Sequence, residues 1–281
     1  MKIRIMTDST CDLSPAYLRE HNVTVIPLTV NLNGTAYSDN GVDITPDHIF
    51  ESVAGGSDLP KTSAINVEDY KAAFKEALKT CDAIVHFAIS AEFSSCHGNA
   101  VLAAEGLPVH CVDSRNLSTG IGLLVAEAVD MVEAGCDDPG AIAAHCEGMI
   151  DKVDCSFILN RLDYLHKGGR CSMVAMLGAN MLHLKPCIEV VDGRMIVGRK
   201  FRGSLDRCVR QYVEDRLHDP EALSAKRCAI VHTNLSPDQI AVIRAIVESR
   251  KHFDEILEVR AGSTICSHCG ENTMGLILMR N

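Results

Sequence analysis

Short apolar segments alternate with helical segments through the first half of the chain, and this alternation restricts the fold more than any other feature. Strand-like segments lie at 2–6, 84–90 and 108–114, and a polar turn and a helical pattern follow each of them. A further single strand is predicted over 23–30. Strands that are separated by helices form a mostly parallel sheet with helices on both faces. We therefore predict an α/β domain, with an α/β/α layering, at the N-terminal end. Ligands of such sheets bind at the carboxyl ends of the strands, so we expect Asp8, residues 90–95 and Asp113, which all follow or end strands, to meet at one edge.

The second half of the chain has a different pattern. Two strand-like segments, 187–191 and 194–198, flank Asp192-Gly193, a dipeptide that is typical of tight hairpin turns. Further strands are predicted at 155–159, 227–232, 256–259 and 274–279. Helices mixed with antiparallel strands indicate an α+β fold. We place the boundary so that residues 1–155 form the N-terminal domain and residues 156–281 form the C-terminal domain.

Hydrophobic content and net charge exclude several classes of function. A chain of 281 residues that is 47% hydrophobic can bury two cores. Its formal net charge of -10 argues against nucleic-acid binding, which needs a basic surface. The negative charge also disfavours a membrane-surface role for the whole molecule. Only transient membrane contact through a local basic patch remains possible. The sequence has no apolar run of 18 residues, and its first eight residues lack the apolar region of a signal peptide, so we expect a cytoplasmic protein.

A serine-rich turn joins one of the predicted strands to a helix. Residues 90–96 read Ser-Ala-Glu-Phe-Ser-Ser-Cys, and the composition then becomes helical. The first turn of a helix leaves backbone N–H groups unpaired, and its dipole favours a negative charge there. Ser94 and Ser95 could therefore cap the helix or donate hydrogen bonds to an anionic ligand. The stretch alone leaves both roles open.

Six short motifs occur in an order that resembles one protein family. They are Thr-Asp-Ser-Thr-Cys-Asp-Leu at 7–13, Lys-Thr-Ser at 61–63, the serine-rich turn at 90–96, Asp-Ser-Arg at 113–115, Leu-His-Lys-Gly-Gly-Arg at 165–170 followed by Lys-Pro at 185–186, and Ile-Cys-Ser-His-Cys-Gly at 265–270. Each motif is short, but their order and spacing are specific, and together they span about residues 2–280. On these motifs the sequence resembles the DegV family of bacterial fatty-acid-binding proteins.

The resemblance implies a two-domain DegV-like fold with a long-chain fatty acid, of the palmitate or oleate class, buried between the domains. It implies that Thr62 and Ser94 hold the carboxylate, that His268 lies near it, and that Ser63 and Ser95 support the site. On this view the protein is a lipid-binding protein and not an enzyme, with no catalytic residues, no metal and no cofactor beyond the bound fatty acid. Some family members present the carboxylate to a separate fatty acid kinase.

An apolar helix is predicted over 173–184, and it is a candidate wall for the acyl chain. Its candidate lining residues are Met173, Met176 and Leu177. Met and Leu side chains fit an irregular apolar ligand well. Ordinary core packing is the alternative for each of them.

A locally basic stretch at 194–210 contrasts with the acidic chain. The resemblance implies that Arg202 in this stretch, together with Arg170, contacts the kinase. The alternative is a solvated surface whose arginines pair with Asp206, Glu214 and Asp215. A docking surface for a kinase would need exposed cations, because complementary charge guides association.

Two other functions compete with lipid binding. A hydrolase could use Ser94 and His268, but a nucleophile elbow needs glycines two residues on either side of the serine, where this chain has Glu92 and Cys96. Metal or redox chemistry could use Cys266 and Cys269, but a lone Cys-x-x-Cys lacks the second ligand pair of a structural zinc site.

The sequence also departs from the family's motifs in places that bear on the ligand. Glu92 replaces a glycine beside the implied carboxylate, and a second carboxylate there would repel an anionic ligand unless it points outward. Glu271 and Asn272 replace a proline and a glycine after the last motif.

Overall fold

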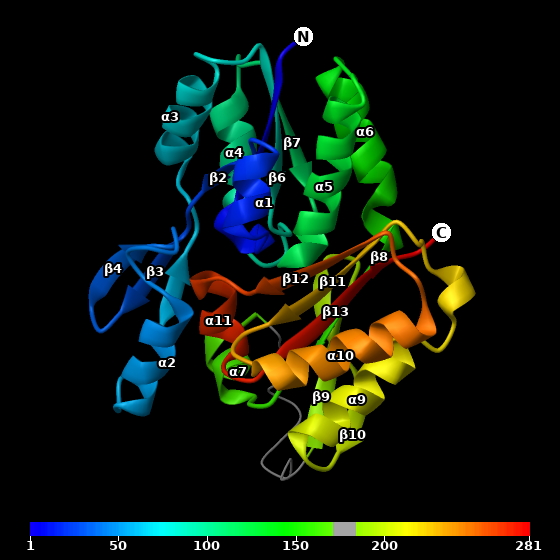
Figure 1. Cartoon of the computed structure of the whole chain (residues 1–281). Coiled ribbons are helices and arrows are strands. Elements are labelled where there is room, and N and C mark those ends of the chain that lie inside the picture. Colours follow the sequence, from blue (N-terminus) through cyan, green and yellow to red (C-terminus); the bar gives the residue numbers. More distant parts are fainter. Residues whose placement is uncertain (171–183) are drawn as a thin grey trace.

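The computed structural model describes residues 1–170 and 184–281 and divides them between two main sheets (Figure 1). The first sheet is parallel throughout, in the order β2-β1-β6-β7. Its strands are β1 (Ile3–Asp8), β2 (Thr24–Ile26), β6 (Ala83–Ala88) and β7 (Val109–Asp113). Helices α3 (Val67–Ala77) and α4 (Cys96–Ala104) lie on one side of this sheet, and α5 (Thr119–Glu133) and α6 (Pro139–Met149) lie on the other. The predicted α/β/α layering is confirmed.

The second sheet is mixed and has the strand order β10-β9-β8-β13-β11-β12. Its strands are β8 (Val153–Ile158), β9 (Leu184–Val191), β10 (Arg194–Arg202), β11 (Arg227–His232), β12 (Glu255–Arg260) and β13 (Met274–Met279). β11 and β12 pair in parallel, and the other neighbours pair antiparallel. Helices α9 (Leu205–Arg216) and α10 (Pro237–Arg250) cover the face that is turned away from the first sheet. The predicted α+β half, with its hairpin at Asp192-Gly193, is confirmed.

Helix α5 lies between the two sheets and joins their cores. Every residue from 119 to 129 is buried, and the helix contacts β1 and β6 as well as β8, β11 and β13. One hydrophobic cluster therefore runs through both halves of the molecule. The first strand of the second sheet begins at Val153. The division of the chain at 155/156 stays a prediction.

A third, small sheet pairs β3 with β4 and β5. The smaller elements of the chain are β3 (Thr29–Leu32), β4 (Thr35–Ser38), β5 (Lys61–Ser63), α1 (Pro15–Glu20), α2 (Pro46–Ala54), α7 (Asp163–Gly168), α11 (Ser263–Cys269) and the 3-10 turns η1 (Ser9–Cys11), η2 (Ile150–Lys152) and η3 (Pro220–Ala222). A single strand over 23–30 was predicted, and this was wrong: β2 ends before Pro27, and β3 joins another sheet. Proline has no N–H group to donate, so the first sheet cannot continue through it.

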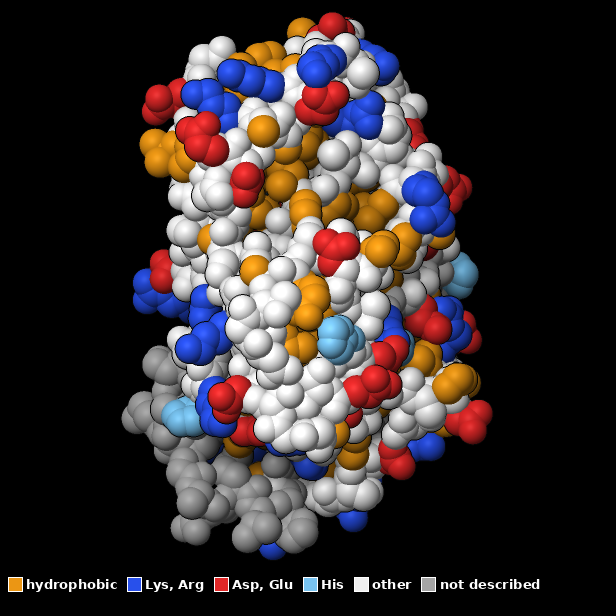
Figure 2. Space-filling view, turned by 90° about the vertical axis from the view of Figure 1, so that its left-hand side faces the viewer, with side chains coloured by type: hydrophobic (Ala, Val, Ile, Leu, Met, Phe, Trp, Pro, Cys, Tyr) orange, Lys and Arg blue, Asp and Glu red, His pale blue; other side chains and the backbone are white. Residues whose placement is uncertain are grey.

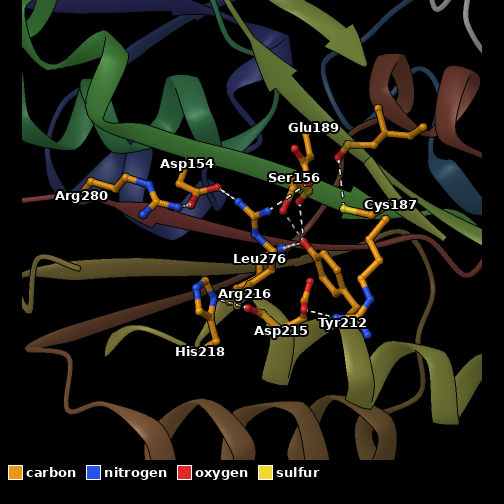
Figure 3. A network of polar contacts seen from close by, with 12 residues as sticks. Asp154, Ser156, Cys187, Glu189, Tyr212, Asp215, Arg216, His218, Leu276 and Arg280 are labelled. Atoms are coloured by element: carbon orange, nitrogen blue, oxygen red, sulfur yellow. Dashed lines mark hydrogen bonds and ion pairs between the residues drawn. The ribbon is translucent and has the colours of Figure 1, made fainter. Parts of the chain in front are cut away.

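A polar network fixes α9 against the second sheet (Figure 3). The Tyr212 hydroxyl lies 2.8 Å from both the hydroxyl and the carbonyl oxygen of Ser156. Arg216 and Arg280 both pair with Asp154, whose side chain is only 6% exposed. Two guanidinium groups thus offset the cost of burying one carboxylate. These contacts tie α9 and the end of the chain to β8.

The apolar helix predicted over 173–184 falls outside the described residues except for its last position, and so do Met173, Met176 and Leu177. Leu184 is already the first residue of β9, so this strand begins three residues earlier than predicted. Among the helices of residues 1–170 and 184–281, none is both long enough and apolar enough to cross a membrane.

Figure 2 shows the face that lies at the left of Figure 1. Basic and acidic side chains are interspersed on it, and hydrophobic side chains are exposed between them in the upper half. The described side chains of this face form no continuous basic surface, in keeping with the net charge of -10. The described part of this face therefore gives no support to nucleic-acid binding.

Candidate functional site

The carboxyl ends of neighbouring strands hold the serine-rich turn. Asp8, the last residue of β1, accepts hydrogen bonds from the N–H groups of Ile89 (2.8 Å) and Thr10 (3.0 Å). Asp113, the last residue of β7, accepts one from the N–H of Ala91 at 3.2 Å. The turn after β6 is therefore fixed by carboxylates on both sides. The predicted convergence of these strand ends is confirmed.

Helix α11 carries His268, and carboxylates from the first half of the chain hold its N-terminal end. Asp12 accepts a hydrogen bond from the N–H of Gly262 at 2.8 Å, and Asp39 accepts from the next two N–H groups, each at 3.1 Å. They satisfy groups that the first helical turn leaves unpaired. Burial raises the pKa of Asp12 to about 8. The motif at 7–13 thus positions both the serine-rich turn and α11.

The Cys-x-x-Cys segment lies inside α11, where the sequence predicted no helix. Both thiols are buried, and burial raises the pKa of Cys269 to about 12 and holds that of Cys266 well above its usual value. Metal binding and thiol chemistry use the thiolate, which this environment disfavours. Within the described parts of the chain, no group of three or more His, Cys, Asp or Glu side chains is placed to hold a metal ion.

Thr62, Ser94 and His268 line one cavity of about 40 Å³. They come from β5, from the turn before α4 and from α11. The Thr62 hydroxyl lies 2.8 Å from Nε2 of His268, and the Ser94 hydroxyl accepts a hydrogen bond from the N–H of Cys96 at 3.3 Å. Most of the other described lining is apolar and includes Leu28, Ile89, Phe93, Leu117 and Ile265. A few polar groups in an otherwise apolar cavity suit an amphipathic ligand with one polar end.

His268 is held neutral at pH 7. Burial lowers the pKa of His268 to about 4, and the positive charge of Arg170 acts in the same direction. Arg170 lines the same cavity and donates a hydrogen bond to the carbonyl oxygen of Gly168 at 2.7 Å. Gly168 packs against the imidazole so closely that a Cβ at this position would overlap Nδ1 of His268. This contact explains the need for a glycine in the 165–170 motif.

A second apolar cavity, of about 20 Å³, adjoins the first. The two cavities share Leu117, Ile265 and Cys269, and the second runs between the start of α5 and the second sheet, past Phe157 and Ile277. Cavities of these sizes hold a few water molecules at most. A long apolar ligand therefore needs the walls to move apart.

The β9–β10 hairpin reaches across to the serine-rich turn. The Ser90 hydroxyl donates a hydrogen bond to the carbonyl oxygen of Gly193 at 2.8 Å, and the Glu92 carboxylate pairs with Arg194 at 2.9 Å. We call these two contacts the hairpin clasp. Met195 of the same hairpin lines the first cavity. Arg194 lowers the pKa of Glu92, so this carboxylate stays charged and paired at the surface and does not repel an anion in the cavity.

Some predicted site residues lie away from the cavity. Ser63 and Ser95 are exposed and do not line it, and Arg202 is exposed at the end of β10. Ser94 and His268 both line it, but their described hydrogen bonds go to other residues and not to each other. This arrangement gives no support to the hydrolase hypothesis, which needs a serine paired with a histidine base.

Proteins of known sequence and structure resemble the whole chain. It is 32% identical to a DegV domain-containing protein of Deinococcus radiodurans, over 99% of this chain and 98% of that protein. It is 28% identical to a fatty acid-binding protein of Thermotoga maritima, over 98% of this chain and 96% of that protein. A DegV family protein of Thermus thermophilus, described for its fatty acid binding, superposes with a TM-score of 0.91 at 29% identity and full coverage of both chains.

A stearic acid-binding protein of Eubacterium ventriosum is also similar. Its TM-score is 0.86 at 26% identity, and the match covers 99% of this chain and 98% of that one. The sequence profile of the DegV family, described as uncharacterised proteins, matches residues 2–281. The family predicted from the six motifs is confirmed: the chain belongs to the DegV family.

Proposed function

We propose that this protein binds a long-chain fatty acid, with the carboxylate in the cavity lined by Thr62, Ser94 and His268 and the acyl chain extending into the second apolar cavity. The observation that carries the proposal is the meeting of these three side chains in an otherwise mostly apolar cavity that shares lining residues with the second one. Relatives described as fatty-acid-binding proteins support it. The protein would act as a lipid carrier, with no catalytic residue of its own.

The neutral state of His268 decides how the carboxylate is held. If Nε2–H donates to the Thr62 oxygen, the Thr62 hydroxyl keeps its own proton for the ligand. The Ser94 hydroxyl donates to Sγ of Cys96 at 3.2 Å in this structure, and by rotating it would supply a second donor to the carboxylate. The charge of Arg170 favours an anion in the same cavity. Hydroxyl donors hold a carboxylate less tightly than a bidentate arginine does, which suits a ligand that must be released.

The acyl chain supplies most of the binding free energy. Each buried CH₂ group contributes about 0.8 kcal/mol, so a chain of the palmitate or oleate class gains about 10 kcal/mol before ordering costs. Titration of delipidated protein with palmitate and with oleate, followed by calorimetry, tests the proposal. Saturable binding of at least one of them at one molecule per chain is expected, and no heat of binding with either would contradict it.

The hairpin clasp should control ligand exchange, because it closes the turn that carries Ser94. Ser90→Ala removes a buried hydrogen bond to Gly193, a loss of about 1 to 1.5 kcal/mol, so dissociation of a fluorescent fatty acid should become about tenfold faster. Arg194→Ala breaks only an exposed ion pair and should change the rate little. An unchanged rate in Ser90→Ala, measured by stopped-flow displacement, would show that the ligand leaves by another route.

We further propose that the protein presents the carboxylate to a separate fatty acid kinase in the cytoplasm. There a carboxylate oxygen would attack the γ-phosphorus of ATP, giving an acyl phosphate and ADP. Arg202 and Arg210 are exposed, and no carboxylate of the described residues pairs with them, whereas Arg199 pairs with Asp215. The stretch at 194–210 is therefore only partly neutralised, which leaves cations for a docking partner.

Arg202→Ala is expected to reduce kinase-coupled acyl-phosphate formation by about tenfold and to leave the fatty-acid Kd within about twofold. The reason is that Arg202 lies outside the cavity, at the end of β10. Arg199→Ala is the matched control and should affect neither quantity much. Equal turnover of Arg202→Ala and the parent would assign this arginine to ordinary solvated surface.

Arg170→Ala should lower both the fatty-acid affinity and the kinase-coupled turnover, because Arg170 lines the cavity.

A further inference from the structure

Thr264 carries a buried hydroxyl group that has no hydrogen-bond partner in the described structure. The residue is 3% exposed, and its Oγ1 is fully buried. Its backbone N–H is already bonded to Asp39, so the side chain alone is unsatisfied. An unsatisfied buried hydroxyl costs about 1 to 3 kcal/mol, so its lack of a partner calls for an explanation.

Thr264 lines the same cavity as the proposed carboxylate ligands. The other polar groups of that cavity are engaged: Thr62 with His268, Ser94 with Cys96. Among the residues that line this cavity in the described structure, only Thr264 and His268 carry a buried polar side-chain atom without a partner, and Gly168 covers Nδ1 of His268. Oγ1 of Thr264 therefore offers one hydrogen bond that the carboxylate site does not use.

The position of Thr264 indicates which part of a ligand would meet it. Thr264 lies one helical turn before His268 on α11, so its backbone is displaced from the histidine by about 6 Å along the helix axis. A hydrogen bond from a ligand hydroxyl to Oγ1 of Thr264 would cover about 2.8 Å of this displacement. About 3 Å then remain between the ligand's carboxyl group and that hydroxyl, which is the length of two to three carbon–carbon bonds of an extended chain. An unsubstituted acyl chain would place methylene groups here and leave the hydroxyl unsatisfied.

We infer that this protein prefers a fatty acid that carries a hydroxyl group close to its carboxyl end, of the 3-hydroxy class, and that Thr264 selects it. The inference rests on the proposed fatty-acid site and specifies its ligand. The hydroxyl of the ligand bonds to Oγ1 of Thr264, while Thr62 and Ser94 hold the carboxylate. Because Thr264 is fixed by its backbone bond to Asp39, one enantiomer of the ligand fits better than the other.

The test compares hexadecanoate with each enantiomer of 3-hydroxyhexadecanoate by titration of delipidated protein. The parent should bind the better enantiomer about 5- to 100-fold more tightly than hexadecanoate. Thr264→Val keeps the shape of the side chain and removes the hydroxyl, so it should lose this preference and bind hexadecanoate at least as well as the parent. Thr264→Ser keeps the hydroxyl and removes a methyl group, so it should retain the preference.

The outcomes separate this inference from the proposed function. If hexadecanoate binds and neither enantiomer binds more tightly, or if the preference survives in Thr264→Val, the inference is wrong and the fatty-acid site stands. If none of the three acids binds the parent, the proposed function fails with it. Melting temperatures of both variants, measured in parallel, check that each is folded.

Discussion

Replacing both Thr62 and Ser94 by alanine is expected to weaken fatty-acid binding by a factor of about 30 to 10⁴. In the proposed site each hydroxyl donates one hydrogen bond to the carboxylate, and the loss of one such charge-assisted bond costs about 1 to 3 kcal/mol. Each single variant should therefore lose about 5- to 150-fold in Kd. Calorimetric titration with palmitate measures the effect, because the acyl chain still supplies enough affinity to be detected.

The neighbouring serines provide matched controls for this pair. Ser63 and Ser95 follow Thr62 and Ser94 directly in the sequence, but both are exposed and lie away from the cavity. Ser63→Ala together with Ser95→Ala should bind like the parent. If the Thr62/Ser94 double variant also binds like the parent, while its melting temperature is unchanged, the carboxylate is held elsewhere.

Gly168→Ala is expected to weaken binding by about 10- to 100-fold, although residue 168 donates nothing to the ligand. The added Cβ would overlap Nδ1 of His268, so the imidazole must move and its contact with the Thr62 hydroxyl is lost. Overpacking of this kind costs about 1 to 3 kcal/mol. The Kd for palmitate should rise above that of the parent, and the melting temperature should fall below the parent's.

Two further variants identify the cause of this effect. Gly98→Ala adds a methyl group in α4, where no atom lies within 4 Å, and should leave binding unchanged and stabilise the protein by about 0.5 to 1 kcal/mol. In the His268→Ala background, Gly168→Ala should no longer destabilise, because the overlapping ring is gone. Equal destabilisation in both backgrounds would place the strain elsewhere in the 165–170 segment.

The parallel sheet could be predicted because its signal is local. Each strand of the first half is a short apolar run bounded by polar turns, and a helical pattern follows it, so periodicity alone gives the layering. The convergence of Asp8 and Asp113 on the turn at 90–96 followed from topology, since the carboxyl ends of parallel strands meet at one edge. The strand over 23–30 failed at Pro27, whose missing N–H should have ended it.

Helix α11 could not be predicted, because what stabilises it comes from far along the chain. Its seven residues are mostly small or polar, and the carboxylates of Asp12 and Asp39 hold its first turn from more than 200 positions away. Thr264 could not be identified from the sequence either, because its surroundings also come from distant parts of the chain. Its proposed role comes from the absence of a partner among the described residues, and a sequence does not state which hydroxyls are satisfied.

Glu92 shows how a long-range pair changes the interpretation of a residue. In the sequence it is a carboxylate beside the implied anion site, where it would repel the ligand unless it pointed outward. In the structure the β9–β10 hairpin brings Arg194 within 2.9 Å, so the charge is paired at the surface and Glu92 becomes part of the clasp. Residues 92 and 194 lie in different halves of the chain, so no local pattern connects them.

Analysis of the lipid that the purified protein carries tests the central claim most directly. The parent and the Thr62/Ser94 double variant would be purified in parallel, extracted with organic solvent and analysed by mass spectrometry for free fatty acids. We expect about one long-chain fatty acid per parent chain and a much smaller amount in the double variant. An extract without any acyl lipid, from a parent protein that also fails to bind added palmitate or oleate, would contradict the proposal that this protein binds a fatty acid.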